Sequence, residues 1–265
     1  MFRKLLYPTD LSQLSLKGLE WTAKNLLQGE SEILIAHVVD PASGTRTPEI
    51  THDVKQYLDD ISRELSERNI QNTIFLETGN ATEILPDLAH SAGCTASVLF
   101  VPEYEKVTPV VRMIPIPHFI AKCPEDRMPV GNPFEEIVLC TDLSFERIDS
   151  MLTQLRPILE GYETRITLLH SVTLEDPQTS EEVFRTASEA LEEVRLSVKE
   201  WNPRTEAVLA SGEPEEELLK QCALLGAKLV IVGLSTHGEL WNLIIGSTGE
   251  SIIERSAAPV LVLPT

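Results

Sequence analysis

The sequence predicts an α/β protein that consists of two tandem, doubly wound, parallel-sheet domains. Three observations predict this fold: the chain repeats itself, short apolar runs alternate with longer amphipathic stretches, and aromatic residues are scarce. Hydrophobic residues make up 42% of the 265 residues, charged residues 24% and aromatic residues 5%. Such a composition is typical of a folded globular protein, and its aliphatic bias favours sheets that are buried on both faces.

The repeat consists of four pairs of matching segments. Residues 4–12 (KLLYPTDLS) return as 136–144 (EIVLCTDLS), so Asp10 and Asp142 correspond at an offset of 132 residues. A nearly constant offset along the chain indicates a tandem duplication of a unit of about 130 residues. The other three pairs are 33–40 with 166–176, 78–89 with 211–223, and 96–102 with 228–234.

Strands and helices are expected to alternate within each copy. In the second copy the runs EIVLC, ITLLHSV, AVLAS, KLVIVG and PVLVLP are short and rich in Val, Ile and Leu, which is typical of buried parallel strands. His170 and its counterpart His37 fall within such runs and are expected in the core. Residues 180–201 carry apolar side chains at helical spacing, and STGESIIERS predicts a last helix. Ligands of such folds bind near the carboxyl ends of the strands.

The two copies differ most in residues 101–133, which contain seven of the 17 prolines. Proline breaks helices, so the fourth helix of the first copy is expected to be shortened or lost. The MPVGNP end of this stretch marks the boundary between the copies. The sequence therefore predicts domains at residues 1–130 and 134–265.

The charge and the cysteines restrict the kinds of partner and the compartment. A formal net charge of −19 disfavours binding to nucleic acid and to anionic membranes. No apolar run reaches the roughly 18 residues that span a bilayer, and the N-terminal apolar run is too short for a signal peptide. Four widely spaced cysteines without a CxxC motif indicate reduced thiols, so a cytoplasmic protein is expected. No HExxH motif or Cys/His quartet predicts a metal site.

The glycines of GLSTHGELWNLIIGST (residues 233–248) allow two interpretations: a phosphate cradle, or turns that join a strand to a helix. The first turn of the helix that follows has unpaired N–H groups, which attract anions without a basic side chain. Ser247 could equally be an ordinary N-cap, with Glu250 as its capping-box partner. No Lys or Arg occurs from residue 233 to 249, so little in this loop could activate phosphoryl transfer.

Together these motifs resemble the universal stress protein family, here as a tandem pair with a UspA-like unit in each half. The resemblance rests on the PTD/CTD strand ends, the LLH strand, the G-x-P-x-E-x-L-L helix start and the terminal GST…IIERSAAPVLVLP. It implies an adenine-nucleotide alpha hydrolase-like fold. In nucleotide-binding members the pattern G-x2-G-x9-G-[ST] implies that backbone amides hold the ATP phosphates.

The second copy matches this pattern incompletely. Gly233 and Gly246 have the expected separation, but Thr236 occupies the middle glycine position and Gly238 comes two residues late. A Cβ atom at Thr236 narrows the approach to a phosphate. By resemblance, Asp142 contacts the adenosine part of the ligand; the alternative is a cap at a strand–helix junction. The candidate nucleotide-binding residues are Thr141, Asp142, Val172 (an adenine-pocket wall by resemblance, otherwise core), Gly233, Thr236, Gly238, Gly246, Ser247, Thr248 and Gly249.

The first copy keeps only half of this constellation. Pro8, Thr9 and Asp10 are present, but Val101 replaces the first glycine and no Gly-Ser follows. The first copy is therefore the degenerate one and is not expected to hold a triphosphate.

The sequence thus predicts a stress-response sensor that binds ATP or another adenine nucleotide, with or without Mg²⁺, at one site in the second copy. It is not expected to be an enzyme, although slow ATP hydrolysis stays open. The alternative is a nucleotide-free interaction or scaffold protein whose glycines are structural. The expected partners are an adenine nucleotide and an unidentified protein. The last strand is expected to pair the two copies into a pseudo-dimer within one chain, with a homodimer of chains left open.

Overall fold

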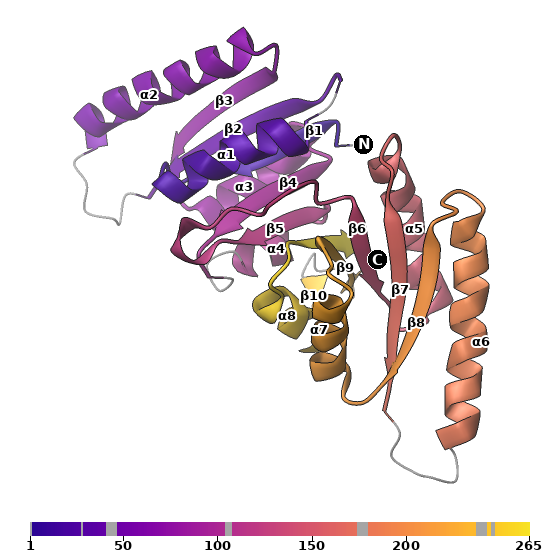
Figure 1. The fold of residues 1–265 in the computed structure, drawn as a ribbon. Coiled ribbons are helices and arrows are strands. Elements are labelled where there is room, and N and C mark those ends of the chain that lie inside the picture. The colour runs from indigo at the N-terminus through magenta and orange to yellow at the C-terminus, as the bar shows by residue number, and fades with distance from the viewer. Residues whose placement is uncertain are drawn as a thin grey trace.

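The computed structural model describes residues 2–27, 29–40, 47–103, 108–173, 180–236, 243–244 and 247–265. In both copies strands alternate with helices (Figure 1). The first copy contains β1 (Lys4–Pro8), α1 (Gln13–Asn25), β2 (Glu32–Val39), α2 (Thr47–Glu67), β3 (Gln71–Thr78), α3 (Ala81–Ser91), β4 (Ala96–Val101), α4 (Thr108–Met113) and β5 (His118–Lys122). The second copy contains β6 (Glu136–Cys140), α5 (Phe145–Leu159), β7 (Arg165–Val172), α6 (Ser180–Lys199), β8 (Thr205–Ser211), α7 (Pro214–Leu224), β9 (Leu229–Thr236), β10 (Leu243–Ile244), α8 (Ser247–Arg255) and β11 (Val260–Pro264).

The described strands form one sheet in the order β3-β2-β1-β4-β5-β11-β9-β6-β7-β8, with β10 paired to β9 off this path. Within each copy the neighbours along the path are parallel, and the two copies have equivalent strand orders. The prediction of two tandem, mostly parallel α/β units is therefore confirmed. In each unit the strand order reverses between the first and fourth strands, where such folds bind ligands.

The two copies join through their last strands. β5 pairs antiparallel with β11, so that Phe119 lies opposite Leu261 and His118 opposite Val262. All four side chains are buried. Because β5 falls inside the proline-rich stretch, the sequence analysis did not identify it. The helix before β5, α4, has six residues against nine in α8, so the expectation of a shortened fourth helix is confirmed.

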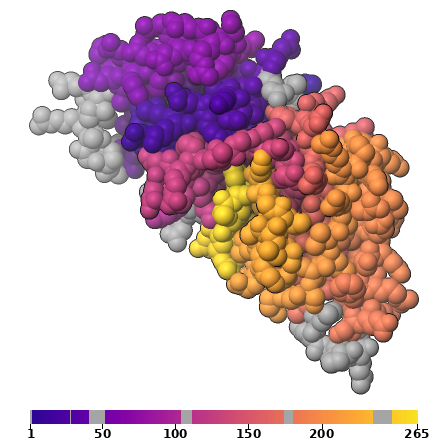
Figure 2. Space-filling model, in the orientation of Figure 1, coloured from indigo at the N-terminus to yellow at the C-terminus, as the bar shows by residue number. Residues whose placement is uncertain are grey.

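Helices cover both faces of the sheet. α1, α2, α5 and α6 pack on one face, where a single cluster of buried apolar side chains extends through both copies. On the other face, α3 packs with the strands of the first copy, while α7, α8 and the end of α4 pack around the seam and the second copy. The copies lie next to each other along an elongated body (Figure 2). None of the described helices has both the length and the apolar character needed to cross a membrane.

A fully buried histidine lies beside the seam. The Nδ1 atom of His118 is 2.6 Å from the Ser97 hydroxyl, and its Nε2 atom is 2.8 Å from the carbonyl oxygen of Ile114. A carbonyl only accepts, so Nε2 carries the proton and Nδ1 accepts from Ser97. Burial lowers the pKa of His118 from 6.5 to about 4, which keeps the ring neutral in the folded protein.

Acidification is therefore expected to destabilise the protein through His118. Below about pH 6.5 the unfolded chain binds a proton that the folded protein does not bind until about pH 4, so stability falls across this window. The contribution is about 3 kcal/mol. Chemical denaturation of the wild type and of His118→Gln can be followed from pH 7 to pH 4. The difference in unfolding free energy between the two proteins should decrease by that amount as the pH falls. Parallel pH profiles would show that this histidine does not titrate as described.

Candidate functional site

The turn after β6 is held by its own side chains. Thr141 Oγ1 accepts the backbone N–H of Leu143 at 3.0 Å, and Asp142 Oδ1 accepts that of Ser144 at 3.0 Å. Leu143 adopts a left-handed conformation with φ of 61°. Ser144 is the N-cap residue of α5, yet its side chain makes no capping bond. Asp142 thus stabilises the turn before the helix rather than capping the helix, and its second oxygen remains for another partner.

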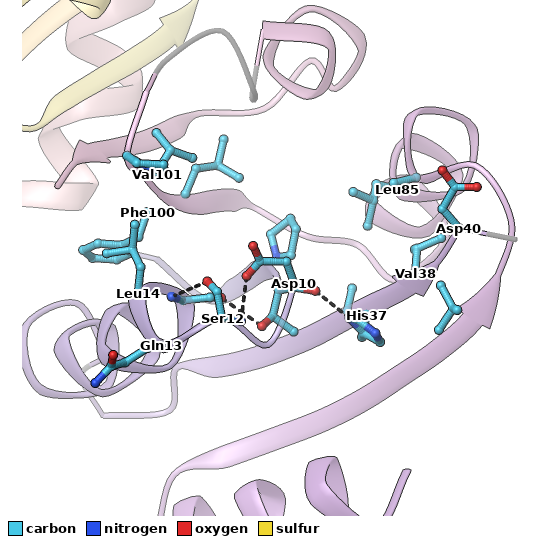
Figure 3. A pocket seen from close by; sticks show the side chains of 18 of the residues that line it. Asp10, Ser12, Gln13, Leu14, His37, Val38, Asp40, Leu85, Phe100 and Val101 are labelled. Carbon is cyan, nitrogen blue, oxygen red and sulfur yellow. Dashed lines mark hydrogen bonds between the residues drawn. The ribbon is translucent and has the colours of Figure 1, made fainter. Parts of the chain in front are cut away.

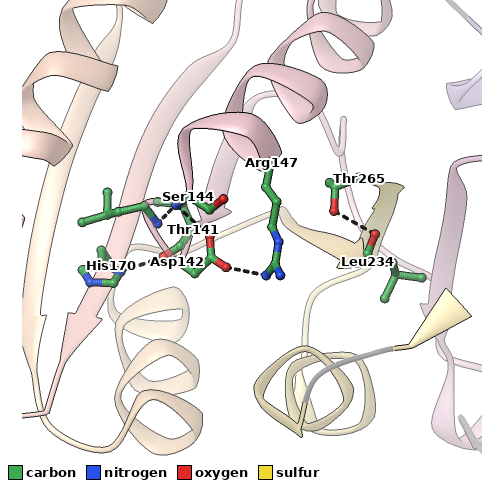
Figure 4. Close-up of polar contacts among 8 residues, drawn as sticks. Thr141, Asp142, Ser144, Arg147, His170, Leu234 and Thr265 are labelled. Carbon is green, nitrogen blue, oxygen red and sulfur yellow. Dashed lines mark hydrogen bonds and ion pairs between the residues drawn. The ribbon is translucent and has the colours of Figure 1, made fainter. Parts of the chain in front are cut away.

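That partner is Arg147, which the sequence analysis missed. Its Nη1 atom lies 2.6 Å from Asp142 Oδ2 (Figure 4). The two side chains are 43% and 52% exposed, and exposed ion pairs contribute only about 0.2–1 kcal/mol. A ligand could therefore open this pair at small cost. The spacing was a usable signal, because a residue five positions after Asp142 lies in the first turn of the helix that follows.

His170 anchors the same turn from β7. Its Nδ1 atom lies 2.7 Å from the carbonyl oxygen of Thr141 (Figure 4). Nδ1 must donate in this bond, so the neutral ring has an acceptor at Nε2. The residue is only partly buried and lines a cavity. The expectation of a core position is therefore wrong.

These groups surround a cavity of about 340 Å³ at the carboxyl ends of β6, β7 and β9. Its size is within the range of small-molecule sites. Of the described side chains that line it, Arg147 alone is positively charged. The wall on β7 is formed by His170 and Ser171, while the buried Val172 is not part of it. The lining residues are Cys140, Thr141, Asp142, Arg147, Met151, His170, Ser171, Pro214, Leu218, Val232, Gly233, Thr248, Gly249 and Ile252.

Gly233 has a packing role in this wall. It lies inside β9, paired with Leu263 of β11. A Cβ atom there would lie 2.9 Å from Met151 Sδ and 3.0 Å from Thr265 Cγ2, so the Met151 and Thr265 side chains would have to shift to accommodate it. The interpretation that Gly233 only turns the chain is therefore wrong, because it allows α5 and the C-terminus to approach the strand.

The remaining predicted residues of the glycine stretch that the structure describes fall on two elements, β9 and α8. Thr236 ends β9 and pairs with Leu243 of β10, so a short antiparallel pair stands where the sequence suggested a loop. Ser247 begins α8, and Thr248 and Gly249 in its first turn line the cavity. The N–H groups at the start of a helix favour an anion. Gly238 and Gly246 lie outside the described residues.

Cys140 at the cavity wall is not a reactive thiol. A hydrogen bond with Cys222, together with burial, raises the pKa of Cys140 well above its ordinary value. A thiol that stays protonated is a poor nucleophile and a poor metal ligand. All four cysteines are free and buried. Within the described residues, no group of three or more His, Cys, Asp and Glu side chains could hold a metal ion.

The first copy repeats the same turn. Leu11 N–H donates to Thr9 Oγ1 at 3.0 Å, and Ser12 N–H donates to Asp10 Oδ1 at 2.9 Å. His37 Nδ1 lies 2.7 Å from the carbonyl oxygen of Thr9 (Figure 3), so this histidine is also not a simple core residue. The duplication thus preserves the scaffold of the site in both halves.

The fold and the site define a tandem α/β protein with a cavity at the carboxyl ends of the strands. The profile of the Universal stress protein family matches residues 1–102 and 133–264. The chain therefore belongs to the Universal stress protein family.

Individual relatives agree with this assignment. The chain is 28% identical over 82 residues to the universal stress protein YxiE of Bacillus subtilis (strain 168). The matched segment covers 31% of this chain and 55% of that protein. It is 27% identical over 96 residues to the stress response protein NhaX of the same organism, covering 36% of this chain and 56% of that protein. The matched segments thus span little more than half of these curated relatives.

Two solved structures share the fold over nearly the whole chain. A universal stress protein from Archaeoglobus fulgidus DSM 4304 has a TM-score of 0.75 at 19% identity. The match covers 100% of this chain and 99% of that chain. A functionally unknown protein from Pseudomonas aeruginosa PAO1 has a TM-score of 0.70 at 15% identity, covering 99% and 92%. These likenesses show that the tandem arrangement recurs.

Proposed function

We propose that this protein is a stress-response sensor that binds one adenine nucleotide, ATP or AMP, in the cavity of the second copy. The observation that carries the proposal is the convergence of Asp142, Arg147 and the first turn of α8 on that cavity. A nucleotide needs acceptors for its amino and hydroxyl groups, apolar contacts for its base, and positive potential for its phosphates. The cavity lining contains all three.

Each part of the ligand has residues that suit it. The carboxylate of Asp142 and the free Nε2 of His170 accept from an amino group or a ribose hydroxyl. Leu218, Val232 and Ile252 supply apolar wall for a base. The first turn of α8 suits a phosphate, and Arg147 adds the cation that residues 233–249 lack.

Isothermal titration of nucleotide-free protein with Mg·ATP, AMP and adenosine tests the proposal. Saturable binding near one nucleotide per chain is expected. Asp142→Ala should weaken it by about tenfold or more, since a hydrogen bond to a charged group contributes about 1.5–3 kcal/mol. Asp10→Ala, the matched substitution in the first copy, should leave it unchanged. Equal loss in both variants would contradict a single site in the second copy.

We further propose binding without turnover, in the cytoplasm, with the bound state recognised by a protein partner. The absence of Lys and Arg from residues 233–249 is the sequence-based reason to expect no turnover. Arg147 weakens this reason, because it brings a cation to the cavity. Phosphate release at a saturating ATP concentration therefore has to be measured, and release that depends on Asp142 and Arg147 would make the protein a slow hydrolase.

A nucleotide-free interaction protein is the second candidate. It is favoured by the fact that both carboxylate oxygens of Asp142 already have protein partners, Ser144 and Arg147. No heat of binding up to millimolar ATP would support it. In either case we propose that the pairing of β5 with β11 makes one chain a pseudo-dimer. Its mass in solution would show whether two chains associate further.

A further inference from the structure

The first copy contains a second cavity, of about 890 Å³, more than twice the volume of the one in the second copy. It lies at the carboxyl ends of β1, β2 and β4, where the strand order of this half reverses. This is the place where doubly wound sheets bind ligands. The loss of the glycine motif from this half has therefore not closed the space.

Part of the lining is apolar. Leu14 of α1, Leu85 of α3, and Phe100 and Val101 of β4 face the space (Figure 3). Phe100 is held in place by the ring of Trp21, 5.5 Å away. A preformed apolar wall of this kind favours the hydrocarbon or aromatic part of a ligand.

The charged side chains among the described lining residues are all aspartates. Asp10, Asp40 and Asp126 line the cavity, and the described lining includes no Lys or Arg. Asp126 is already paired with Lys17 at 3.4 Å, and Asp40 also has an interaction partner, so Asp10 is the carboxylate that the proposal uses. His37 donates through Nδ1 to Thr9, so its Nε2 adds another acceptor. The described lining therefore suits a ligand that brings hydrogen-bond donors and no negative charge.

The features that suit an anion in the second copy are replaced here. By the repeat offset, Ser15 stands where the second copy has its cation, Arg147. The start of α1 is also satisfied internally. Ser12 Oγ accepts the N–H of Ser15 at 3.2 Å, and the Ser15 hydroxyl donates to Thr9 at 2.9 Å. Among the described lining residues a phosphate would meet no Lys or Arg, and the N–H of Ser15 is already bonded to Ser12.

We propose that the cavity of the first copy binds an organic cation, a protonated amine on an apolar frame, and that Asp10 contacts the ammonium group. The two halves of the chain then bind ligands of opposite charge on the same scaffold. This site does not depend on nucleotide binding in the second copy.

The probe is 2-phenylethylammonium, with neutral 2-phenylethanol and anionic 3-phenylpropanoate as matched controls, titrated against the full chain by protein-observed NMR. The cation should bind saturably and at least about tenfold more tightly than either control, and added salt should weaken it. Asp10→Asn keeps the oxygen that accepts Ser12 N–H and should weaken binding of the cation by about tenfold. Asp142→Asn, its counterpart in the second copy, should not.

The proposal is overturned if the three probes bind equally, if the cation does not saturate by about 10 mM, or if both Asp→Asn variants lose binding equally. Displacement of the cation by ATP would also overturn it, because it would place both ligands in one cavity. Failure of ATP to bind anywhere would leave the expected results for the cation unchanged, so the two proposals fail separately.

Discussion

Phe119→Ala is expected to lower the free energy of unfolding by about 3–5 kcal/mol, the range for removing a fully buried aromatic ring. Phe119 is completely buried on β5, opposite Leu261 of the other copy. Its ring stacks on Trp21 with centroids 5.4 Å apart. The substitution leaves a cavity at the seam between the copies. The paired strands around this cavity have little freedom to move and fill it. Chemical denaturation followed by circular dichroism measures the effect.

Phe145→Ala is the control for this change. Phe145 begins α5 and is 60% exposed, so the same truncation should alter stability by no more than about 0.5 kcal/mol. A loss below about 1 kcal/mol for Phe119→Ala, or similar losses for both variants, would show that the seam does not stabilise the fold as described.

Gly18→Val is expected to cost about 3 kcal/mol, at the upper end of the range for overpacking a core. A Cβ atom on Gly18 of α1 would lie 2.5 Å from the Phe100 ring and 2.5 Å from the Tyr7 hydroxyl. That hydroxyl donates to the carbonyl oxygen of Ser15 at 2.6 Å, so neither the ring nor the phenol can move without breaking a buried contact. Thermal and chemical denaturation should both report the loss.

Glu20→Val places the same β-branched side chain at an exposed position of the same helix. Only the small difference in helix propensity, a few tenths of a kcal/mol, is expected there. If the two valine variants were equally stable, the close approach of α1 to β4 would not limit the size of residue 18.

The repeat made much of the fold predictable from sequence. Two copies of TDLS after an apolar run placed Asp10 and Asp142 at equivalent strand ends, and both form the same hydrogen-bonded turn. The proline content predicted the short α4. Strand β5 was not predicted, because HFIAK is brief and flanked by prolines, and because its partner, β11, is distant in sequence.

The candidate site was less predictable, for physical reasons. The spacing of Asp142 and Arg147 places both at one turn, but whether they pair depends also on the angle at which α5 leaves that turn. Gly233 looked like a turn residue because glycine's two uses, free backbone angles and absence of a Cβ atom, look alike in a sequence. The cavity of the first copy could not be predicted from the sequence for a similar reason. The lost glycine motif predicts only that no triphosphate binds there, whereas the open space depends on how helices pack around the strand ends.

The antiparallel seam also determines where the two cavities open. Because β5 and β11 run in opposite directions while each copy is internally parallel, the carboxyl ends of the strands point to opposite edges of the shared sheet. The two openings therefore face away from each other, and a compact partner that covers one leaves the other accessible. Between the two cavities, apolar clusters on both faces of the sheet contain buried side chains from both halves.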